Sequence, residues 1–146
     1  MAAPFVVDAS VACKAVVDEP LSDAAHALFA GTDPLVAPSY LLIECANALR
    51  KKVAAAELDR AGALAAYDDL AGAPLEFAPV TPGLTRQALS LALALGHPVQ
   101  DCLYLALAQD RRGRIVTADD AFVRAVRRHR DLASLVIRLA DLPAPS

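Results

Sequence analysis

The chain contains no tryptophan, and aromatic residues make up only 5% of its 146 residues. Alanine, leucine and valine must therefore fill the core, which suits helices packed closely against a sheet. Apolar residues make up 56% and charged residues 21% of the chain, and this composition excludes a disordered protein. A chain of this length predicts one domain that buries about two-thirds of the surface exposed by its unfolded form.

Long hydrophobic runs are absent as well. The longest, "ALSLALALG" at residues 88–96, is about half of the roughly 20 residues that a membrane span requires. No Lys or Arg precedes the first apolar run, and Asp8 interrupts it, so the N-terminus is not typical of a signal peptide. The three cysteines are far apart and form no C-x-x-C pattern, which indicates reduced core thiols. We expect a cytoplasmic protein that contacts no membrane.

The chain also lacks the excess of positive charge that nucleic-acid binders usually carry, since its formal net charge is −3. Its basic residues nevertheless gather in three clusters, at residues 50–52, 111–114 and 124–130. The simplest interpretation of such clusters is a solvated helix face. The sequence contains no H-E-x-x-H, G-x-S-x-G, G-x-G-x-x-G or P-loop pattern, which argues against the enzyme classes that depend on them.

Short apolar segments alternate with amphipathic segments along the chain. Strands are predicted at residues 5–9, 34–38, 75–80, 114–118 and 135–139. Helices are predicted at residues 10–17, 21–31, 39–57, 58–73, 81–96, 100–113 and 119–129, with Ser39 and Thr81 as caps of two of them. This alternation predicts an α/β fold with a mainly parallel central sheet and helices on both faces. We expect one domain over residues 1–141, followed by a short tail over residues 142–146.

Three aspartates occupy the starts of predicted helices. Asp8 and Asp119 each follow an apolar strand, and Asp101 opens the helix after "GHPVQ". In open parallel sheets, ligands bind outside the carboxyl ends of the strands, which is where Asp8 and Asp119 lie. Each of the three can also be explained as a helix cap, since Asp is among the best N-cap residues.

Glu44 is harder to explain by local structure. It lies in the second turn of an apolar helix, within "YLLIECANAL", and is too far from Ser39 to complete a capping box. Glu is almost never fully buried unless it is paired. Glu44, Asn47 and Lys51 fall on one stripe of this helix, which faces either solvent or a polar pocket.

Four carboxylates in one pocket would raise each other's pKa unless a cation lay between them. The three histidines, His26, His97 and His129, are scattered, and we expect them at the surface or in turns. Oxygen ligands without a histidine or cysteine partner favour Mg²⁺, with Mn²⁺ as an alternative, over Zn²⁺. Mg²⁺ takes few carboxylates directly and commonly binds substrate phosphates as well. The expected chemistry is therefore metal-assisted hydrolysis of a phosphodiester by an activated water.

Four stretches, in this order, resemble the motifs of the PIN-domain ribonucleases, and specifically the VapC-type toxins of bacterial toxin–antitoxin pairs. They are "VVDASV" with Asp8 and Ser10, "PSYLLIECANALRK" with Glu44 and Asn47, "DCLYLALA" with Asp101 and Tyr104, and "IVTADDAF" with Thr117, Asp119 and Phe122. The resemblance spans nearly the whole chain. Because two acids are adjacent in the last motif, its T-x-D spacing selects Asp119 and leaves Asp120 as a neighbour or a cap.

The resemblance implies a three-layer α/β/α fold and an endoribonuclease that depends on Mg²⁺ or Mn²⁺. The implied catalytic residues and metal ligands are the same four acids, Asp8, Glu44, Asp101 and Asp119. The residues implied to orient these ligands are Ser10, Asn47 and Thr117. Each of the three can also be explained by local hydrogen bonds or by solvent exposure. Tyr104 and Phe122 are expected in the core.

The family further implies a homodimer and inhibition by a cognate antitoxin whose tail covers the site. An RNA substrate requires basic side chains near the acids, and the candidates are Lys14, Arg50, Lys51, Lys52 and residues 111–114. We expect the helical hairpin at residues 39–73 to form the dimer surface, because it has more apolar residues than one buried stripe uses. Two alternatives stay open: a PIN nuclease that processes RNA or cleaves DNA outside a toxin role, and a metal-binding or partner-binding module without catalysis.

Overall fold

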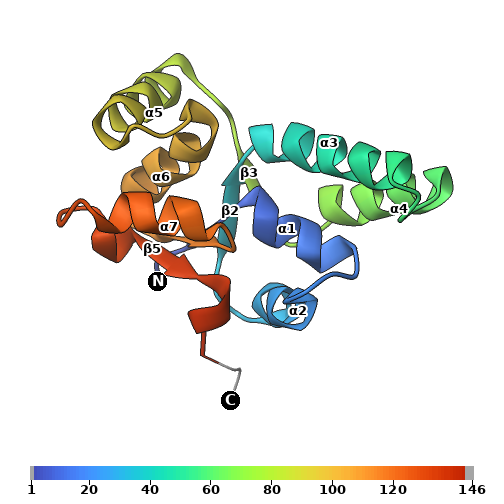
Figure 1. Ribbon diagram of the computed structural model, residues 1–146. Helices are drawn as coiled ribbons and strands as arrows, with labels where there is room; N and C mark the ends of the chain where they lie inside the picture. Colours follow the sequence, from blue (N-terminus) through green and yellow to red (C-terminus); the bar gives the residue numbers. More distant parts are fainter. Residues whose placement is uncertain (1, 144–146) are drawn as a thin grey trace.

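Five short segments form a parallel sheet in the computed structural model, which describes residues 2–143 (Figure 1). The strands are β1 (Phe5–Val7), β2 (Leu35–Pro38), β3 (Glu76–Ala78), β4 (Arg114–Thr117) and β5 (Val136–Arg138). Their order is β3-β2-β1-β4-β5, and every neighbouring pair is parallel. The chain moves outward from β1 in one direction through β2 and β3, and then crosses to β4 on the other side. The topological switch point therefore lies between β1 and β4, where ligands of open α/β sheets bind.

Seven helices cover the two faces of this sheet within the described residues. They are α1 (Ala9–Val16), α2 (Ser22–Ala30), α3 (Tyr40–Ala54), α4 (Arg60–Ala71), α5 (Pro82–Leu95), α6 (Val99–Arg111) and α7 (Asp120–Arg127). Figure 1 shows α1 to α4 on one side of the sheet and α5 to α7 on the other. The predicted three-layer α/β/α fold is thus confirmed. The helices α3 and α4 form the predicted antiparallel hairpin.

The core is built from the apolar residues that the composition predicts. Val6 and Val7 of β1 and Ile115 and Val116 of β4 are fully buried, and so is nearly all of α6 from residue 102 to residue 108. The largest fully buried side chains are Tyr104 and Phe122. All three cysteines are buried and free, as predicted. This buried run of α6 begins directly after Asp101, so the packing of the helix in the core sets the position of Asp101.

Of the two helix caps predicted at Ser39 and Thr81, the structure confirms Thr81. The Thr81 hydroxyl accepts a hydrogen bond from the Leu84 N–H at 3.1 Å, and Pro82 is the first residue of α5. Gly96 ends α5 with φ +65°, a left-handed conformation that favours glycine. The prediction for Ser39 is wrong, because its backbone is already helical (φ −59°, ψ −21°) and its hydroxyl makes no capping hydrogen bond.

The C-terminal part contains two short 3₁₀ helices, η1 (Ala133–Leu135) and η2 (Leu139–Asp141), which the sequence did not predict. Part of the predicted tail, residues 144–146, lies outside the described residues, and the domain limits stay a prediction. Between residues 2 and 143, no single helix has the length and apolar character needed to cross a membrane. Helices α5 and α6 meet that requirement only as a pair bent by 114°.

Candidate metal centre

Four acidic side chains approach the carboxyl edge of the sheet, each from a different element. Asp8 and Asp119 follow the adjacent strands β1 and β4, Asp101 lies in the first turn of α6, and Glu44 lies in the second turn of α3. The charges of Asp8 and Asp101 reach each other and Glu44, and Asp101 also lies beside Asp119. The structure therefore brings the four predicted acids to one place.

Asp8 is fixed by three hydrogen bonds. Its Oδ1 accepts from the Ala9 N–H at 2.8 Å, which caps α1, and its Oδ2 accepts from the hydroxyls of Thr117 at 2.7 Å and Ser10 at 2.9 Å. Only 7% of the residue is exposed. Burial raises the pKa of Asp8 to about 6, the two hydroxyls lower it, and the charge of Asp101 raises it further. The Asp8 carboxylate is thus held in one orientation, and its hydrogen bonds do not fully offset the free-energy cost of burying its charge.

The hydroxyls of Ser10 and Thr117 also connect Asp8 to the segment that carries Asp119. Ser10 Oγ accepts from the Ala118 N–H at 3.1 Å, and Thr117 Oγ1 accepts from the Asp119 N–H at 3.0 Å. Thr117 is fully buried. These bonds hold the ends of β1 and β4 in a fixed relation, so the position of one acid depends on the position of the other.

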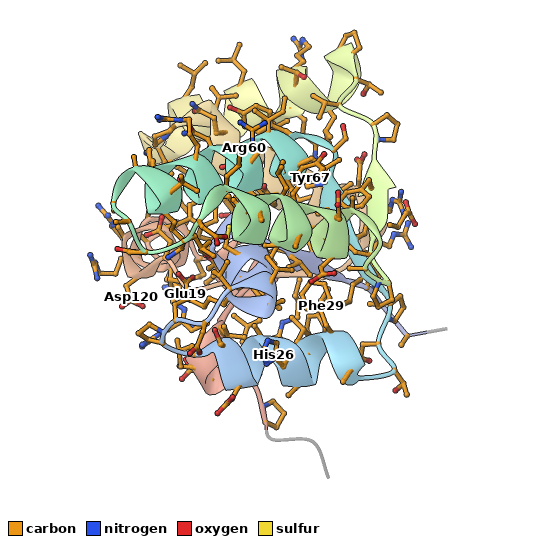
Figure 2. The ribbon with its side chains drawn as sticks, turned by 90° about the vertical axis from the view of Figure 1, so that its right-hand side faces the viewer. Glu19, His26, Phe29, Arg60, Tyr67 and Asp120 are labelled. Atoms are coloured by element: carbon orange, nitrogen blue, oxygen red, sulfur yellow. The ribbon has the colours of Figure 1, made fainter. Side chains whose placement is uncertain are left out.

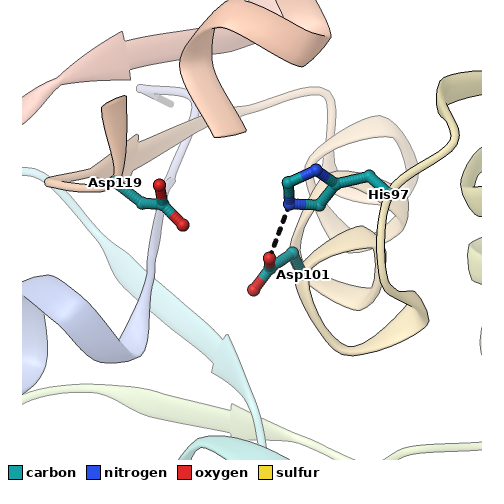
Figure 3. A group of neighbouring side chains, drawn as sticks. All are labelled: His97, Asp101 and Asp119. Atoms are coloured by element: carbon teal, nitrogen blue, oxygen red, sulfur yellow. Dashed lines mark hydrogen bonds and ion pairs between the residues drawn. The ribbon is translucent and has the colours of Figure 1, made fainter. Parts of the chain in front are cut away.

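Asp119 is both a helix cap and a member of the acidic group. Its Oδ1 accepts from the N–H groups of Ala121 and Phe122 at 3.0 and 3.2 Å, which caps α7. Figure 3 shows its carboxylate directed toward Asp101. Asp101, by contrast, caps nothing, because it lies inside the first turn of α6 and that helix has no side-chain cap. The capping explanation is therefore correct for Asp119 but wrong for Asp101.

Glu44 receives a hydrogen bond from the core. The buried Tyr104 hydroxyl donates to Glu44 Oε1 at 2.5 Å. Burial raises the pKa of Glu44 to about 7, the bond from Tyr104 lowers it, and the charges of Asp8 and Asp101 raise it. The prediction that Tyr104 lies in the core is confirmed, but the sequence did not predict its contact with Glu44.

The helical stripe of Glu44, Asn47 and Lys51 lines a cleft of about 610 Å³ that Asp101 also borders. Glu44 is half-buried at this cleft, whereas Asn47 and Lys51 are exposed, so the stripe borders the cleft and solvent together. Asn47 does not contact an acid in this structure. Its Oδ1 accepts instead from Arg50 Nε at 3.2 Å, and Asn47 is exposed.

His97 belongs to this group, which sequence reasoning missed. It lies in the turn between α5 and α6, as predicted, but only 16% of its side chain is exposed. Its Nε2 lies 2.7 Å from Asp101 Oδ2, and its ring centroid lies 5.0 Å from that of Phe122. The expectation that no histidine accompanies the acids is therefore wrong. The available signal was the spacing of four residues between His97 and Asp101 at the start of a helix.

Lysine and arginine side chains do not balance the charges of the four acids. Among the ion pairs of residues 2–143, none joins a lysine or arginine to any of the four. One donor atom from each of His97, Asp101 and Asp119 lies within 4.8 Å of the others (Figure 3). Carboxylate oxygens with one imidazole nitrogen are a suitable donor set for a divalent cation, so these residues fit a metal ion.

Several basic residues expected beside the acids are engaged elsewhere. Lys14 and Lys52 both pair with Glu19, at 3.4 and 3.0 Å, and Arg111 pairs with Glu76. Figure 2 shows Glu19 on the loop that follows α1. Of the basic residues predicted to offset the acids, only Lys51 lines the acidic cleft.

The parallel sheet and the acids at its switch point define an α/β domain with a candidate metal centre. The model of the PIN domain family matches residues 5–128. The chain therefore belongs to the PIN domain family, whose members are nucleases. A search of curated protein sequences finds no match to this chain.

Solved structures share the fold at low sequence identity. PAE2754 from Pyrobaculum aerophilum is 18% identical, with a TM-score of 0.68 over 94% of this chain and 84% of that chain. VapBC2 from Rickettsia felis, bound to a DNA fragment from its promoter, is 15% identical, with a TM-score of 0.66 over 92% and 98%. A toxin–antitoxin complex from Klebsiella pneumoniae is 13% identical, with a TM-score of 0.60 over 79% and 86%. At these identities the likeness concerns the fold alone.

Proposed function

We propose that this chain is a metal-dependent endoribonuclease and the toxin of a toxin–antitoxin pair. The observation that supports nuclease activity is the meeting of four carboxylates at the switch point of a PIN domain, with no ion pair to a lysine or arginine among residues 2–143. Asp8, Glu44, Asp101 and Asp119 would hold Mg²⁺ or Mn²⁺. Such an ion supplies positive charge at the phosphate and activates a water for attack on the phosphodiester.

The surrounding side chains would hold these acids in place. Thr117 and Ser10 direct Oδ2 of Asp8, and Tyr104 directs Oε1 of Glu44. Hydrogen bonds of this kind to metal ligands fix their orientation and tune metal affinity. Asn47, proposed for the same role, lies on the cleft wall beside Glu44 but reaches no acid in this structure. We therefore assign it to the substrate side of the cleft.

The proposal of an RNA substrate is supported by a basic surface on α7. A hollow of about 570 Å³ is lined by Asp120, Val123, Arg124, Arg127, Arg128 and Arg138. Arg138 pairs with Asp120 at 3.2 Å, whereas the other three arginines form no ion pair with any residue between 2 and 143. Asp119 caps the same helix, and its chain neighbour Asp120 lines the hollow. Phosphates on either side of the cut site can bind there.

Partner binding is supported by the apolar surfaces that the domain leaves open. The hairpin of α3 and α4 carries a groove of about 490 Å³. Its lining includes Leu64, which is 56% exposed, and Arg60 and Tyr67, which Figure 2 labels. We assign this groove to a second copy of the chain, as the excess of apolar residues in the hairpin predicts. An antitoxin partner is supported by two structural relatives that are toxin–antitoxin assemblies. Ile43 on α3 and Leu93 on α5, which are 64% and 77% exposed, are further apolar side chains open to a partner.

Growth of a bacterial host that expresses the chain tests this function. We expect the wild-type protein to arrest growth and to leave fragmented RNA, and Asp8→Asn to do neither. The asparagine keeps an oxygen for the Ala9 N–H but lowers the charge that a metal ion requires. Asp33→Asn is the matched control and should leave toxicity intact, because Asp33 is exposed and lines none of the hollows described above.

The outcomes separate the alternatives. Arrest that persists in a folded Asp8→Asn protein would contradict the proposed site. Damaged DNA with intact RNA would favour a DNA-cleaving PIN nuclease. Normal growth with the wild-type chain, together with metal binding and no cleavage by the purified protein, would favour a binding module without catalysis.

A further inference from the structure

The side chain of His97 is held in one orientation by two contacts of different kinds. Its Nε2 lies 2.7 Å from Asp101 Oδ2, and its ring packs against the ring of Phe122, tilted by 48°. Phe122 is itself fully buried, and its N–H donates to Asp119 Oδ1. One core residue therefore fixes both the imidazole and the carboxylate on the opposite side of the group.

Three donor atoms from separate segments meet at this point. His97 comes from the turn before α6, Asp101 from the first turn of α6, and Asp119 from the end of β4. One atom of each lies within 4.8 Å of the others, and Figure 3 shows the Asp119 carboxylate facing His97 and Asp101, which lie together. His26 on α2 gives a contrast, because its side chain is exposed and does not lie among acids (Figure 2).

We propose that His97 supplies a nitrogen ligand to the metal ion at this centre, and that the site therefore prefers Mn²⁺ to Mg²⁺. This inference rests on the proposed metal-dependent function. Imidazole binds first-row transition metals, whereas Mg²⁺ prefers a purely oxygen shell. A site with one nitrogen ligand among its carboxylates therefore favours Mn²⁺ over Mg²⁺ more strongly than a site made of four carboxylates alone.

A positioning role for His97 is the competing explanation. If Nε2 carries the proton, it donates to Asp101 and only orients that carboxylate. If the proton lies on Nδ1, the lone pair of Nε2 is free to bind the metal ion. Both arrangements would weaken activity when His97 is replaced, so activity cannot distinguish them. Direct detection of a metal–nitrogen bond can.

The deciding experiment is electron spin-echo spectroscopy of Mn²⁺ bound to the untagged, purified chain. We expect modulation from a coordinated ¹⁴N nucleus in the wild-type protein and in His26→Gln, and its loss in His97→Gln. His26 is exposed, and its one hydrogen bond within residues 2–143 is to the Ala15 carbonyl, so it is a matched control. In titrations, His97→Gln should bind Mn²⁺ at least about tenfold more weakly. Its affinity for Mg²⁺ should change much less.

The result that would overturn the inference is Mn²⁺ bound to the wild-type chain without ¹⁴N modulation, or modulation that persists in His97→Gln. Either result would leave the acidic centre intact and remove only the nitrogen ligand. Failure of the wild-type chain to bind Mn²⁺, or equal binding by Asp101→Asn, would instead overturn the metal centre itself. Circular dichroism of each variant would show that the domain is folded.

Discussion

At the scale of single residues, two explanations that compete in the sequence are both true in the structure. Asp8 caps α1 with one carboxylate oxygen and receives two hydroxyl bonds on the other. Asp119 caps α7 and still directs its carboxylate toward Asp101 (Figure 3). A strand-to-helix junction on a parallel sheet places a cap and a ligand at the same position, so one residue can serve both purposes.

Glu44 gives a prediction at this scale. Burial raises its pKa to about 7 and that of Asp8 to about 6, whereas both groups ionise near pH 4 in an unfolded chain. Without metal, the folded protein therefore binds more protons than the unfolded chain between about pH 4 and pH 7. Its free energy of unfolding falls as the pH rises through this window. Glu44→Gln should reduce that fall and should melt a few degrees above the wild-type protein near neutral pH in EDTA.

Thermal melts at about pH 5 and about pH 7.5 would check this prediction. Glu57→Gln is the control, since Glu57 is exposed and lies outside the centre. If the melting temperature of Glu44→Gln depended on pH as that of the wild-type protein does, Glu44 would not be the source of this pH dependence. Added Mn²⁺ should reverse the trend in the wild-type protein, because metal binding requires the ionised carboxylates.

At the scale of elements, the sequence predicted all five strands and all seven helices of the described residues, and their ends differ by a few residues. The predicted strands were too long: β1 ends at Val7 and β3 at Ala78, because local apolar patterns do not show where strand pairing stops. The short η1 and η2 helices were missed, since one 3₁₀ turn leaves no periodic pattern. The predicted cap at Ser39 failed because α3 begins with its backbone already helical.

Helix α7 gives a prediction at the element scale. We expect Arg124, Arg127 and Arg128 to bind RNA phosphates, because they line one hollow and pair with no acid among residues 2–143. Replacing the three with glutamine should weaken binding of single-stranded RNA. The slope of log affinity against log salt concentration should fall by about 2, which corresponds to three lost phosphate contacts.

Binding should be measured in an Asp8→Asn background, so that the RNA is not cut during titration. Arg86→Gln on α5 is the single-site control, because Arg86 is exposed and lines none of the hollows described above. An unchanged salt slope in the triple variant would place the RNA elsewhere, with Lys51 in the acidic cleft as the next candidate.

At the scale of the whole molecule, the sequence predicts the three layers of the fold but not every side-chain contact between their helices. Alternating strands and helices imply a parallel sheet, and that places Asp8 and Asp119 at the same edge. The contact of Tyr104 with Glu44, and the position of His97 beside Asp101 and Phe122, depend on how α3, α6 and α7 pack together. No single segment contains that information. The histidine was therefore assigned to an ordinary turn, although it borders the acids.

The most direct test of the central claim is to determine the ends of RNA fragments produced by the purified chain. The account predicts cleavage of labelled cellular RNA with Mg²⁺ or Mn²⁺, none in EDTA, and none by Asp8→Asn. Because water is the attacking group, each cut should leave one phosphomonoester end and one hydroxyl end, and no cyclic phosphate. Cleavage that continues in EDTA and leaves cyclic phosphate ends, made by attack of the RNA's own ribose hydroxyl, would contradict a metal-dependent nuclease at these carboxylates.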